Sequence, residues 1–357
     1  MNHIIKEDAK YIIDCIGHDI NKFSGKKILL TGGTGLIGQS FLALFAYLND
    51  YYFKSKCSVV SLQRNFKKNK WSKEYLVYRD DIKFVDYDVS KKYQDDINYD
   101  FIIHAAGMSA PTFFKSNPTG TIDVNVDGIR WILDLSTKCK PESVLYMSSG
   151  DVYGDPTIVE FDETYTGNVR LDVERSCYME SKRLAETLCH IYFNKYSVPV
   201  KIARPFALFG PGMNYKNDRR VICDFINMAL EDGYITVSGG GKNIRSYTYI
   251  ADATVAFIKI MLSNYNDEAF NIANPNSIVS INKLAKTIHN TFNIKSPVIY
   301  SNKKMSADSP NNVIPSIDKI KKMLNFSPSI SLEKGIERMT YLEPILQKDV
   351  WYIETFA

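Results

Sequence analysis

The segment KKILLTGGTGLIGQSFLALFAYL, Lys26 to Leu48, joins an apolar run to an amphipathic one through a turn rich in glycine. The apolar run predicts a strand, and the spacing of apolar residues after the turn predicts a helix. Glycine at the first position of such a turn allows a tight bend. At the second it lets the backbone approach a pyrophosphate, and at the third it lets the helix lie close to the sheet. The turn therefore predicts a dinucleotide-binding site that comprises Gly32, Gly35, Leu36, Ile37 and Gly38.

The strand expected next, CSVVSLQ, ends without the acidic residue that accepts hydrogen bonds from the adenosine ribose of NAD. Gln63 and Arg64 stand there instead, followed by Lys67 and Lys68. An arginine can bind a 2′-phosphate through two hydrogen bonds, whereas a carboxylate would repel it. The sequence therefore favours NADP over NAD as the cofactor. The alternative is that Arg64 is solvated and that Gln63 alone meets the ribose hydroxyls.

Two further strand ends complete the expected cofactor site. Asp88 and Val89 end the strand IKFVDYDV, and we expect them to border the adenine. His104, Ala105 and Ala106 end the strand DFIIHAAG, and we expect them beside the nicotinamide ribose. We interpret His104 itself as a packed strand residue and not as a catalyst.

Short apolar strands alternate with amphipathic helices from residue 26 to residue 206. This alternation predicts an α/β protein with a Rossmann-type doubly wound parallel sheet and a smaller C-terminal substrate-binding lobe. We expect strands at 26–33, 57–63, 82–89, 100–107, 142–150 and 199–206, and helices at 4–23, 36–48, 121–138, 177–196, 220–230, 252–263, 281–292, 317–324 and 332–346. The expected domains are an N-terminal helical extension (1–24), a NAD(P)-binding Rossmann domain (25–206) and a mainly substrate-binding lobe (207–357), in which residues 244–264 return to the Rossmann domain.

The composition is that of an ordinary globular protein, with 24% charged and 45% hydrophobic residues in 357. A net charge of +4 spread along the chain indicates neither a nucleic-acid partner nor a membrane surface. The six cysteines form no C-x-x-C pair, which favours reduced thiols in a cytoplasmic protein over a disulfide framework or a metal site. We expect neither a secretory signal nor a membrane-spanning segment.

The segment CYMESKRLAE carries Tyr178 and Lys182 four residues apart, hence on one face of the expected helix. A phenol that takes a proton near neutral pH needs a lowered pKa, which an adjacent ammonium and a nicotinium ring provide. The pattern Y-x-x-x-K alone is common by chance. It becomes specific here because it follows the glycine turn by about 140 residues, with MSSGDVYG between them.

With these motifs, residues 26–340 resemble the extended short-chain dehydrogenase/reductase family, which acts on nucleotide sugars. The segments SSGDVYGDP, RSCYMESKRLAETLC, RRVICDFI and IRSYTYIADA look most similar to UDP-glucuronate decarboxylases and their epimerase and dehydratase relatives. The resemblance implies that Tyr178 deprotonates a sugar hydroxyl, usually at C4, and that Lys182 binds the nicotinamide ribose and tunes the phenol. Ser149 would hydrogen-bond the same hydroxyl, and hydride transfer to the cofactor would leave a 4-keto sugar.

The positions after Ser149 distinguish the reactions of this family. In 4,6-dehydratases an Asp and a Glu follow, whereas Gly150 and Asp151 stand here, so we do not expect dehydration. In the decarboxylases a Glu occupies the place of Asp151, and an arginine that matches Arg245 lies near the sugar. There it would hold a carboxylate or the pyrophosphate.

The resemblance also implies substrate contacts from Ser109, with Pro111 and Thr112, and from Arg220. For both Arg220 and Arg245 the alternative is a solvated charge. Ala207 replaces an Asn that usually contacts the substrate's phosphates in this family. The resemblance therefore does not say which residue binds the diphosphate here, or which substrate is bound.

The leading interpretation is a nucleotide-sugar epimerase, because a transient ketone needs no group beyond Tyr178, Lys182 and Ser149. A decarboxylase is the close second, supported by Asp151 and Arg245. NADP would add a third reading, an NADPH-dependent keto-sugar reductase, and a non-catalytic dinucleotide sensor is a remote fourth. The expected partners are a nucleotide-diphosphate sugar and a second copy of the chain. By resemblance, that homodimer would form through the helices at 121–138 and 177–196.

Overall fold

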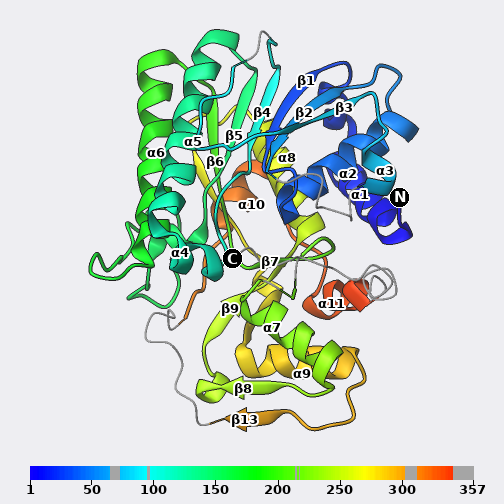
Figure 1. Cartoon of the computed structure of the whole chain (residues 1–357), viewed down its shortest axis with the longest axis vertical. Helices are drawn as coiled ribbons and strands as arrows, with labels where there is room; N and C mark the ends of the chain where they lie inside the picture. The colour runs from blue at the N-terminus through cyan, green and yellow to red at the C-terminus, as the bar shows by residue number, and fades with distance from the viewer. Residues whose placement is uncertain (65–72, 95–96, 214, 217, 302–311, 341–357) are drawn as a thin grey trace.

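The computed structural model in Figure 1 describes residues 1–64, 73–94, 97–213, 215–216, 218–301 and 312–340. Lys67, Lys68 and the part of the expected last helix beyond residue 340 lie outside these described residues. Within them, no helix combines the length and the apolar character that are needed to cross a membrane. All six cysteines have free thiols.

A seven-stranded sheet in the order β11-β6-β5-β4-β1-β2-β3 forms the centre of the molecule, and every neighbouring pair of strands is parallel. Its strands are β1 (Lys27–Thr31), β2 (Ser58–Gln63), β3 (Ile82–Asp86), β4 (Phe101–His104), β5 (Ser143–Met147), β6 (Val200–Pro205) and β11 (Ala269–Ile272). The strand order reverses between β1 and β4, where Thr31 and His104 lie in register. Ligands of doubly wound sheets bind at this switch point. The predicted Rossmann-type fold is confirmed.

Helices cover both faces of the sheet, so its strands are apolar on both sides. In β1, Ile28 and Leu30 belong to the core cluster beneath α2 (Leu36–Tyr51) and α8 (Ile250–Met261). Leu29 points to the opposite cluster, beneath α5 (Pro118–Cys139) and α6 (Ser176–Tyr196). Figure 1 shows α5 and α6 side by side along one flank of the sheet.

The smaller body below the sheet in Figure 1 contains α7, α9, β8 and β13. Its elements are β7 (Leu208–Phe209), α7 (Val221–Asn227), β8 (Thr236–Ser238), β9 (Ile244–Ser246), β10 (Thr248–Tyr249), β12 (Ile278–Ser280), α9 (Ile281–Thr291) and β13 (Ile299–Ser301). The remaining short helices are α3 (Lys73–Leu76), α4 (Pro111–Ser116), α10 (Asp318–Leu324) and α11 (Leu332–Thr340). The sequence analysis missed β11, which is defined as a strand by its pairing with β6. The proposed domain limits stay a prediction.

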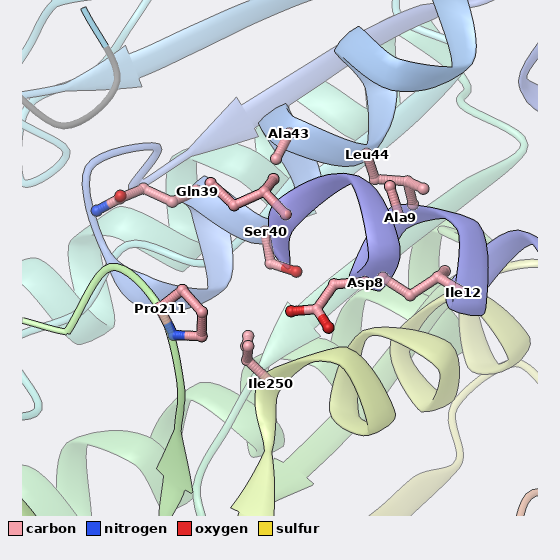
Figure 2. A pocket seen from close by; sticks show the side chains of 10 residues that line it. Asp8, Ala9, Ile12, Gln39, Ser40, Ala43, Leu44, Pro211 and Ile250 are labelled. Carbon is pink, nitrogen blue, oxygen red and sulfur yellow. The ribbon is translucent and has the colours of Figure 1, made fainter. Parts of the chain in front are cut away.

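The N-terminal extension forms α1 (His3–Ile16), which lies against α2 and α8. Its Tyr11 hydroxyl donates to Asp252 Oδ1 at 2.5 Å, and Asp8 Oδ2 accepts from the Tyr249 hydroxyl at 2.7 Å. Arg338 of α11 forms an ion pair with Asp8. Figure 2 shows the Asp8 carboxylate facing a small cavity of about 30 Å³ between α1, α2 and α8. Buried polar contacts thus join α1 to helices distant in sequence.

This attachment makes stability depend on pH. Burial is the largest influence on the Asp8 carboxyl and raises its pKa from 3.8 to about 6, against the hydrogen bond from Tyr249 and the charge of Arg338. The folded state binds the proton of Asp8 more tightly than the unfolded state does. The protonated carboxyl therefore adds to the free energy of unfolding below about pH 4, and this stabilisation is lost as the pH rises through about 6. Asp8→Asn cannot titrate, so its free energy of unfolding should rise relative to wild type by about 2–3 kcal/mol over that range.

Urea unfolding at a series of pH values measures the difference. The control is Asp14→Asn, on the exposed side of the same helix, which should keep the pH dependence of the wild type. If the free energy of unfolding depends on pH in the same way in wild type and in Asp8→Asn, the raised pKa of Asp8 is contradicted.

Candidate active site

The glycine turn lies between β1 and α2, at the switch point of the sheet. Gly32 has φ 76°, and a methyl group added there would lie 2.7 Å from the amide nitrogen of Ala106. A methyl group at Gly38 would lie 2.2 Å from the carbonyl oxygen of Gly32. Gly35 is exposed and caps α2 without a side-chain hydrogen bond, and Leu36 and Ile37 form the partly buried first turn of that helix. The amides at such a helix start suit a phosphate group.

Gln63 ends β2 directly behind this turn, and its side chain is only 3% exposed. Its Oε1 accepts from the Ser61 hydroxyl at 3.0 Å, and a methyl group at Gly33 would lie 2.3 Å from the same oxygen. Its Nε2 is buried and has no hydrogen-bond partner among the described residues. A buried amide donor without a partner costs free energy, so this end of β2 fits a ligand oxygen. The residues present therefore fit a dinucleotide.

Arg64 is exposed at the same strand end, and Asp88 lies within reach of its charge. Burial opposes ionisation of Asp88, but hydrogen bonds from Ser90 and the charges of Arg64 and Lys91 outweigh it and lower the pKa. The carbonyl of Val89 accepts from the indole of Trp131 at 2.6 Å, so Trp131 is a core residue. Asp88, which the sequence predicts to border the adenine, therefore lies near Arg64.

His104 is a packed strand residue, as the sequence indicates. Its Nδ1 lies 2.9 Å from the Thr31 hydroxyl, and its ring stacks on Tyr146. Complete burial, with the charge of Lys182 adding to it, lowers its pKa to about 3, so the ring is neutral. Ala105 and Ala106 continue past it against the glycine turn.

Tyr178 and Lys182 occupy one buried face of α6 beside the end of β5. Lys182 Nζ donates to the carbonyl of Met147 at 2.8 Å and lies 6.0 Å from the centre of the Tyr178 ring. Ser149 follows β5 directly and hydrogen-bonds Tyr178. The four predicted catalytic residues, Tyr178, Lys182, Ser149 and Asp151, therefore lie together, because the turn after β5 faces the start of α6.

The net effect of the protein's own groups is to raise the pKa of Tyr178. Burial is the largest influence and raises it, and the charge of Asp151 raises it further. The hydrogen bond from Ser149 and the charges of Arg220 and Arg175 act in the opposite direction but are weaker. Burial also lowers the pKa of Lys182 to about 8. Among the protein's own groups, desolvation thus outweighs the influences that lower the pKa of Tyr178, before the charge of any nicotinium ring is added.

Three guanidinium groups lie near Asp151 or Tyr178. Arg175 Nη2 lies 3.6 Å from Asp151 Oδ1, and Arg220 forms an ion pair with Asp218 while its charge reaches Tyr178. Arg245 donates to the carbonyl of Ile244 at 2.7 Å, and burial lowers its pKa. All three arginines are partly buried, so the alternative of a fully solvated charge does not apply. The sequence analysis missed Arg175, although it stands three residues before Tyr178, close to one helical turn.

The loop after β4 covers this site from the other side. Ser109 is exposed on it, and Phe114 of the following α4 stacks on the Tyr178 ring with centroids 5.9 Å apart. Asn125 of α5, also missed, donates to the Ser181 hydroxyl at 2.9 Å. Its buried Oδ1 has no partner among the described residues and lies near Gly107, beside Lys182. A ligand hydroxyl would satisfy this acceptor.

The structure gives a physical reason for Gly150. A methyl group there would lie 2.2 Å from the ring of Phe206, so no acidic side chain fits unless that ring moves. Ala207 has φ 33°, a conformation that side chains rarely adopt. Gly150 follows β5 and Ala207 follows β6, so both positions lie near the carboxyl ends of central strands.

The fold and the grouped Tyr178, Lys182 and Ser149 define an enzyme of the extended short-chain dehydrogenase/reductase kind. The chain belongs to the NAD dependent epimerase/dehydratase family, whose profile matches residues 28–273. It is 31% identical over 315 residues to UDP-glucuronic acid decarboxylase 1 of Xenopus tropicalis, covering 88% of this chain and 71% of that protein. UDP-glucuronic acid decarboxylase 3 of Arabidopsis thaliana is 33% identical over 316 residues, covering 88% and 87% of the two chains.

A solved structure with the same fold is that of UDP-glucose 4-epimerase from Thermotoga maritima. It superposes with a TM-score of 0.75 at 21% identity and covers 90% of this chain and 99% of that one. These relatives confirm the resemblance to nucleotide-sugar epimerases and decarboxylases that the sequence indicates.

Proposed function

We propose that this enzyme oxidises a nucleotide-linked uronic acid at C4 and releases carbon dioxide from the resulting keto acid. The observation that carries the proposal is that Arg175 and Arg220 act on Tyr178, while Arg175 and Arg245 act on Asp151 beside it. Such a concentration of partly buried guanidinium groups suits a substrate that has anionic groups besides its hydroxyls. The relatives named UDP-glucuronic acid decarboxylase support the same substrate class.

In this proposal Tyr178 takes the proton of the C4 hydroxyl while Ser149 holds the oxygen by a hydrogen bond. A nicotinamide dinucleotide held at the glycine turn would supply the acceptor for the C4 hydride, and would return that hydride to C4 after carbon dioxide has left. The ketone at C4 then stands β to the C6 carboxylate, so the C5–C6 bond can break with its electrons passing into an enolate at C4 and C5. Arg245 and Arg175 hold the carboxylate or the diphosphate, and a proton returns to C5.

The test incubates the purified enzyme with UDP-linked glucuronic acid and with matched UDP-hexoses, with NAD and with NADP. Product mass and NMR then distinguish the reactions. Loss of carbon dioxide from the uronate supports the proposal, and its absence with every cofactor and every uronate contradicts it.

Epimerisation at C4 is the second candidate. It is favoured by Tyr178, Lys182 and Ser149 alone, since returning hydride to the other face of a ketone needs no further group. In the same panel it would give a product of unchanged mass and new stereochemistry. Loss of water would contradict our interpretation of Gly150.

We also propose that NADP is the preferred cofactor, on the basis of Arg64 and of the unpartnered Gln63 amide, both of which suit a phosphate. NADP that exchanges in each turnover would point to a net keto-sugar reductase. Arg64→Asp should weaken NADP binding tenfold or more, because a charged hydrogen bond contributes roughly 1.5–3 kcal/mol.

The affinity of Arg64→Asp for NAD should change much less than that for NADP, and titration of each dinucleotide measures both. The matched control is Lys91→Asp, another cation near Asp88, which should keep the ratio of the two affinities. An unchanged NADP affinity in Arg64→Asp would contradict the proposed phosphate contact.

For the assembly, we propose a homodimer through α5 and α6. The outer surface of these helices exposes the apolar side chains of Ile122, Leu184 and Ile191, which are 42%, 47% and 42% exposed. Apolar side chains grouped on neighbouring helices are typical of an interface between subunits.

A cytoplasmic location stays a prediction from the sequence.

A further inference from the structure

We infer that Glu186 is a positioning residue of this active site, which holds the turn that carries Ser149 and keeps a negative charge beside Lys182. The inference rests on the proposed function for its reaction, but on contacts among the chain's own residues for its geometry. Glu186 stands one helical turn after Lys182 and two turns after Tyr178 on α6. The three side chains therefore follow one another along the buried face of the helix.

The Glu186 carboxylate is held on both oxygens. Oε1 accepts from the Ser148 hydroxyl at 2.5 Å and from Arg204 Nε at 2.9 Å, and Oε2 accepts from Arg204 Nη2 at 2.6 Å. The side chains of Glu186 and Arg204 are each 13% exposed. A bidentate pair at this depth is rigid.

The same network extends beneath the substrate side of the cleft. Arg204 Nη1 donates to the Tyr153 hydroxyl at 2.6 Å, and that hydroxyl donates to Asn271 Oδ1 at 2.7 Å. Tyr153 belongs to the short helix that Ser149 caps. Glu186 and Arg204 therefore hold this helix from both ends, through Ser148 before it and through Tyr153 within it.

The charged and titratable groups that face Lys182 are few. Glu186 of α6 acts to keep the ammonium charged, while burial opposes it. The rings of Tyr146 and Tyr178 also lie against it, and His104 of β4 is neutral. The Cys189 thiol is also neutral, since burial raises its pKa. Glu186 is thus the carboxylate that balances the Lys182 charge among these groups.

The loss of that charge has a direct consequence for the reaction. Lys182 must stay protonated to assist Tyr178, and burial has already brought its pKa to about 8. Removing the carboxylate leaves the Arg204 charge unbalanced nearby, which disfavours the ammonium further. Activity should then be lost at a lower pH than in the wild type.

The experiment compares Glu186→Gln, Glu186→Asp and Ser148→Ala across pH, using the sugar that the wild type converts. Glu186→Gln keeps the shape and removes the charge, so the alkaline limb of kcat should move down by about one pH unit. Glu186→Asp keeps the charge and shortens the reach, so the limb should stay while kcat falls. Ser148→Ala should lower kcat without moving the limb or KM. The control is Glu180→Gln, whose carboxylate is 42% exposed on the same helix.

Thermal unfolding of each variant accompanies the kinetics, because an unpaired buried arginine can destabilise the fold. If Glu186→Gln folds and the alkaline limb of its kcat lies at the same pH as in the wild type, the inference is overturned. It is also overturned if Ser148→Ala has the kcat of the wild type. If Glu186→Gln does not fold, Ser148→Ala and Glu186→Asp decide the matter. Should the wild type convert no sugar, the proposed function fails by itself. In that case the variants are compared with the wild type by the pH at which dinucleotide affinity falls, since Lys182 contributes to that affinity.

Discussion

Replacing Tyr178 by phenylalanine is expected to lower kcat by roughly a hundredfold to ten-thousandfold, the usual contribution of a positioned general acid or base. Phenylalanine keeps the buried ring, its stacking on Phe114 and the shape of α6, and removes only the group that exchanges the proton. Dinucleotide affinity and the thermal midpoint should therefore stay near those of the wild type. Steady-state kinetics, dinucleotide titration and thermal unfolding measure the three quantities.

Tyr146→Phe is the matched control for this loss. Tyr146 is also fully buried and also lies against Lys182, at 5.0 Å from Nζ to the ring centre. Its hydroxyl has no partner among the described residues, so removing it should change neither activity nor stability by much. Equal activities of Tyr178→Phe and wild type would refute the assignment of Tyr178 as the base and leave a protein that only holds a dinucleotide.

Replacing Gly38 by alanine is expected to damage both the fold and the cofactor site. The added methyl group would meet the carbonyl oxygen of Gly32 at 2.2 Å and Gly33 Cα at 2.6 Å. These are backbone atoms, which cannot rotate away as a side chain would. Forced separation of α2 from the turn should cost about 1–3 kcal/mol of unfolding free energy and most of the dinucleotide affinity.

Gly35→Ala distinguishes the two effects. Its methyl group would lie 3.4 Å from the same carbonyl, a far milder contact, and Gly35 has an ordinary φ of −77°. We expect this variant to fold with near-wild-type stability and to bind dinucleotides tenfold more weakly or worse, because we predict that the backbone at Gly35 approaches the pyrophosphate. Urea unfolding and dinucleotide titration measure the outcome. Full affinity in Gly35→Ala would contradict the placement of the phosphates.

Local patterns in the sequence were sufficient for six of the seven strands of the sheet and for the core of the site. Strands β1 to β6 follow from apolar runs, and α6 follows from a long amphipathic segment whose bounds differ from the expected ones by one residue. The helix expected at 121–138 begins earlier in the structure, at Pro118, because the Asn117 side chain caps α5 there. Tyr178 and Lys182 share a face because helical geometry places residues four apart together. Such features depend on neighbours in the chain, so a single sequence carries them.

Other features depend on residues that meet only in the folded chain. The attachment of α1 through Asp8, the exclusion of a side chain at Gly150 by Phe206, and the network of Glu186 all join distant segments. No local pattern encodes these contacts.

The sequence by itself determined the Rossmann-type sheet, the glycine turn and the Tyr178–Lys182 pair, since each is a short-range consequence of spacing and residue type. Only the tertiary structure decided the charge of the site, by bringing Arg175 and Arg245 near Asp151 and Arg220 near Tyr178. It also decided that burial raises the pKa of Tyr178 above its ordinary value. The physical reason is that desolvation and electrostatic balance are set by everything that surrounds a group in space, whatever its position along the chain.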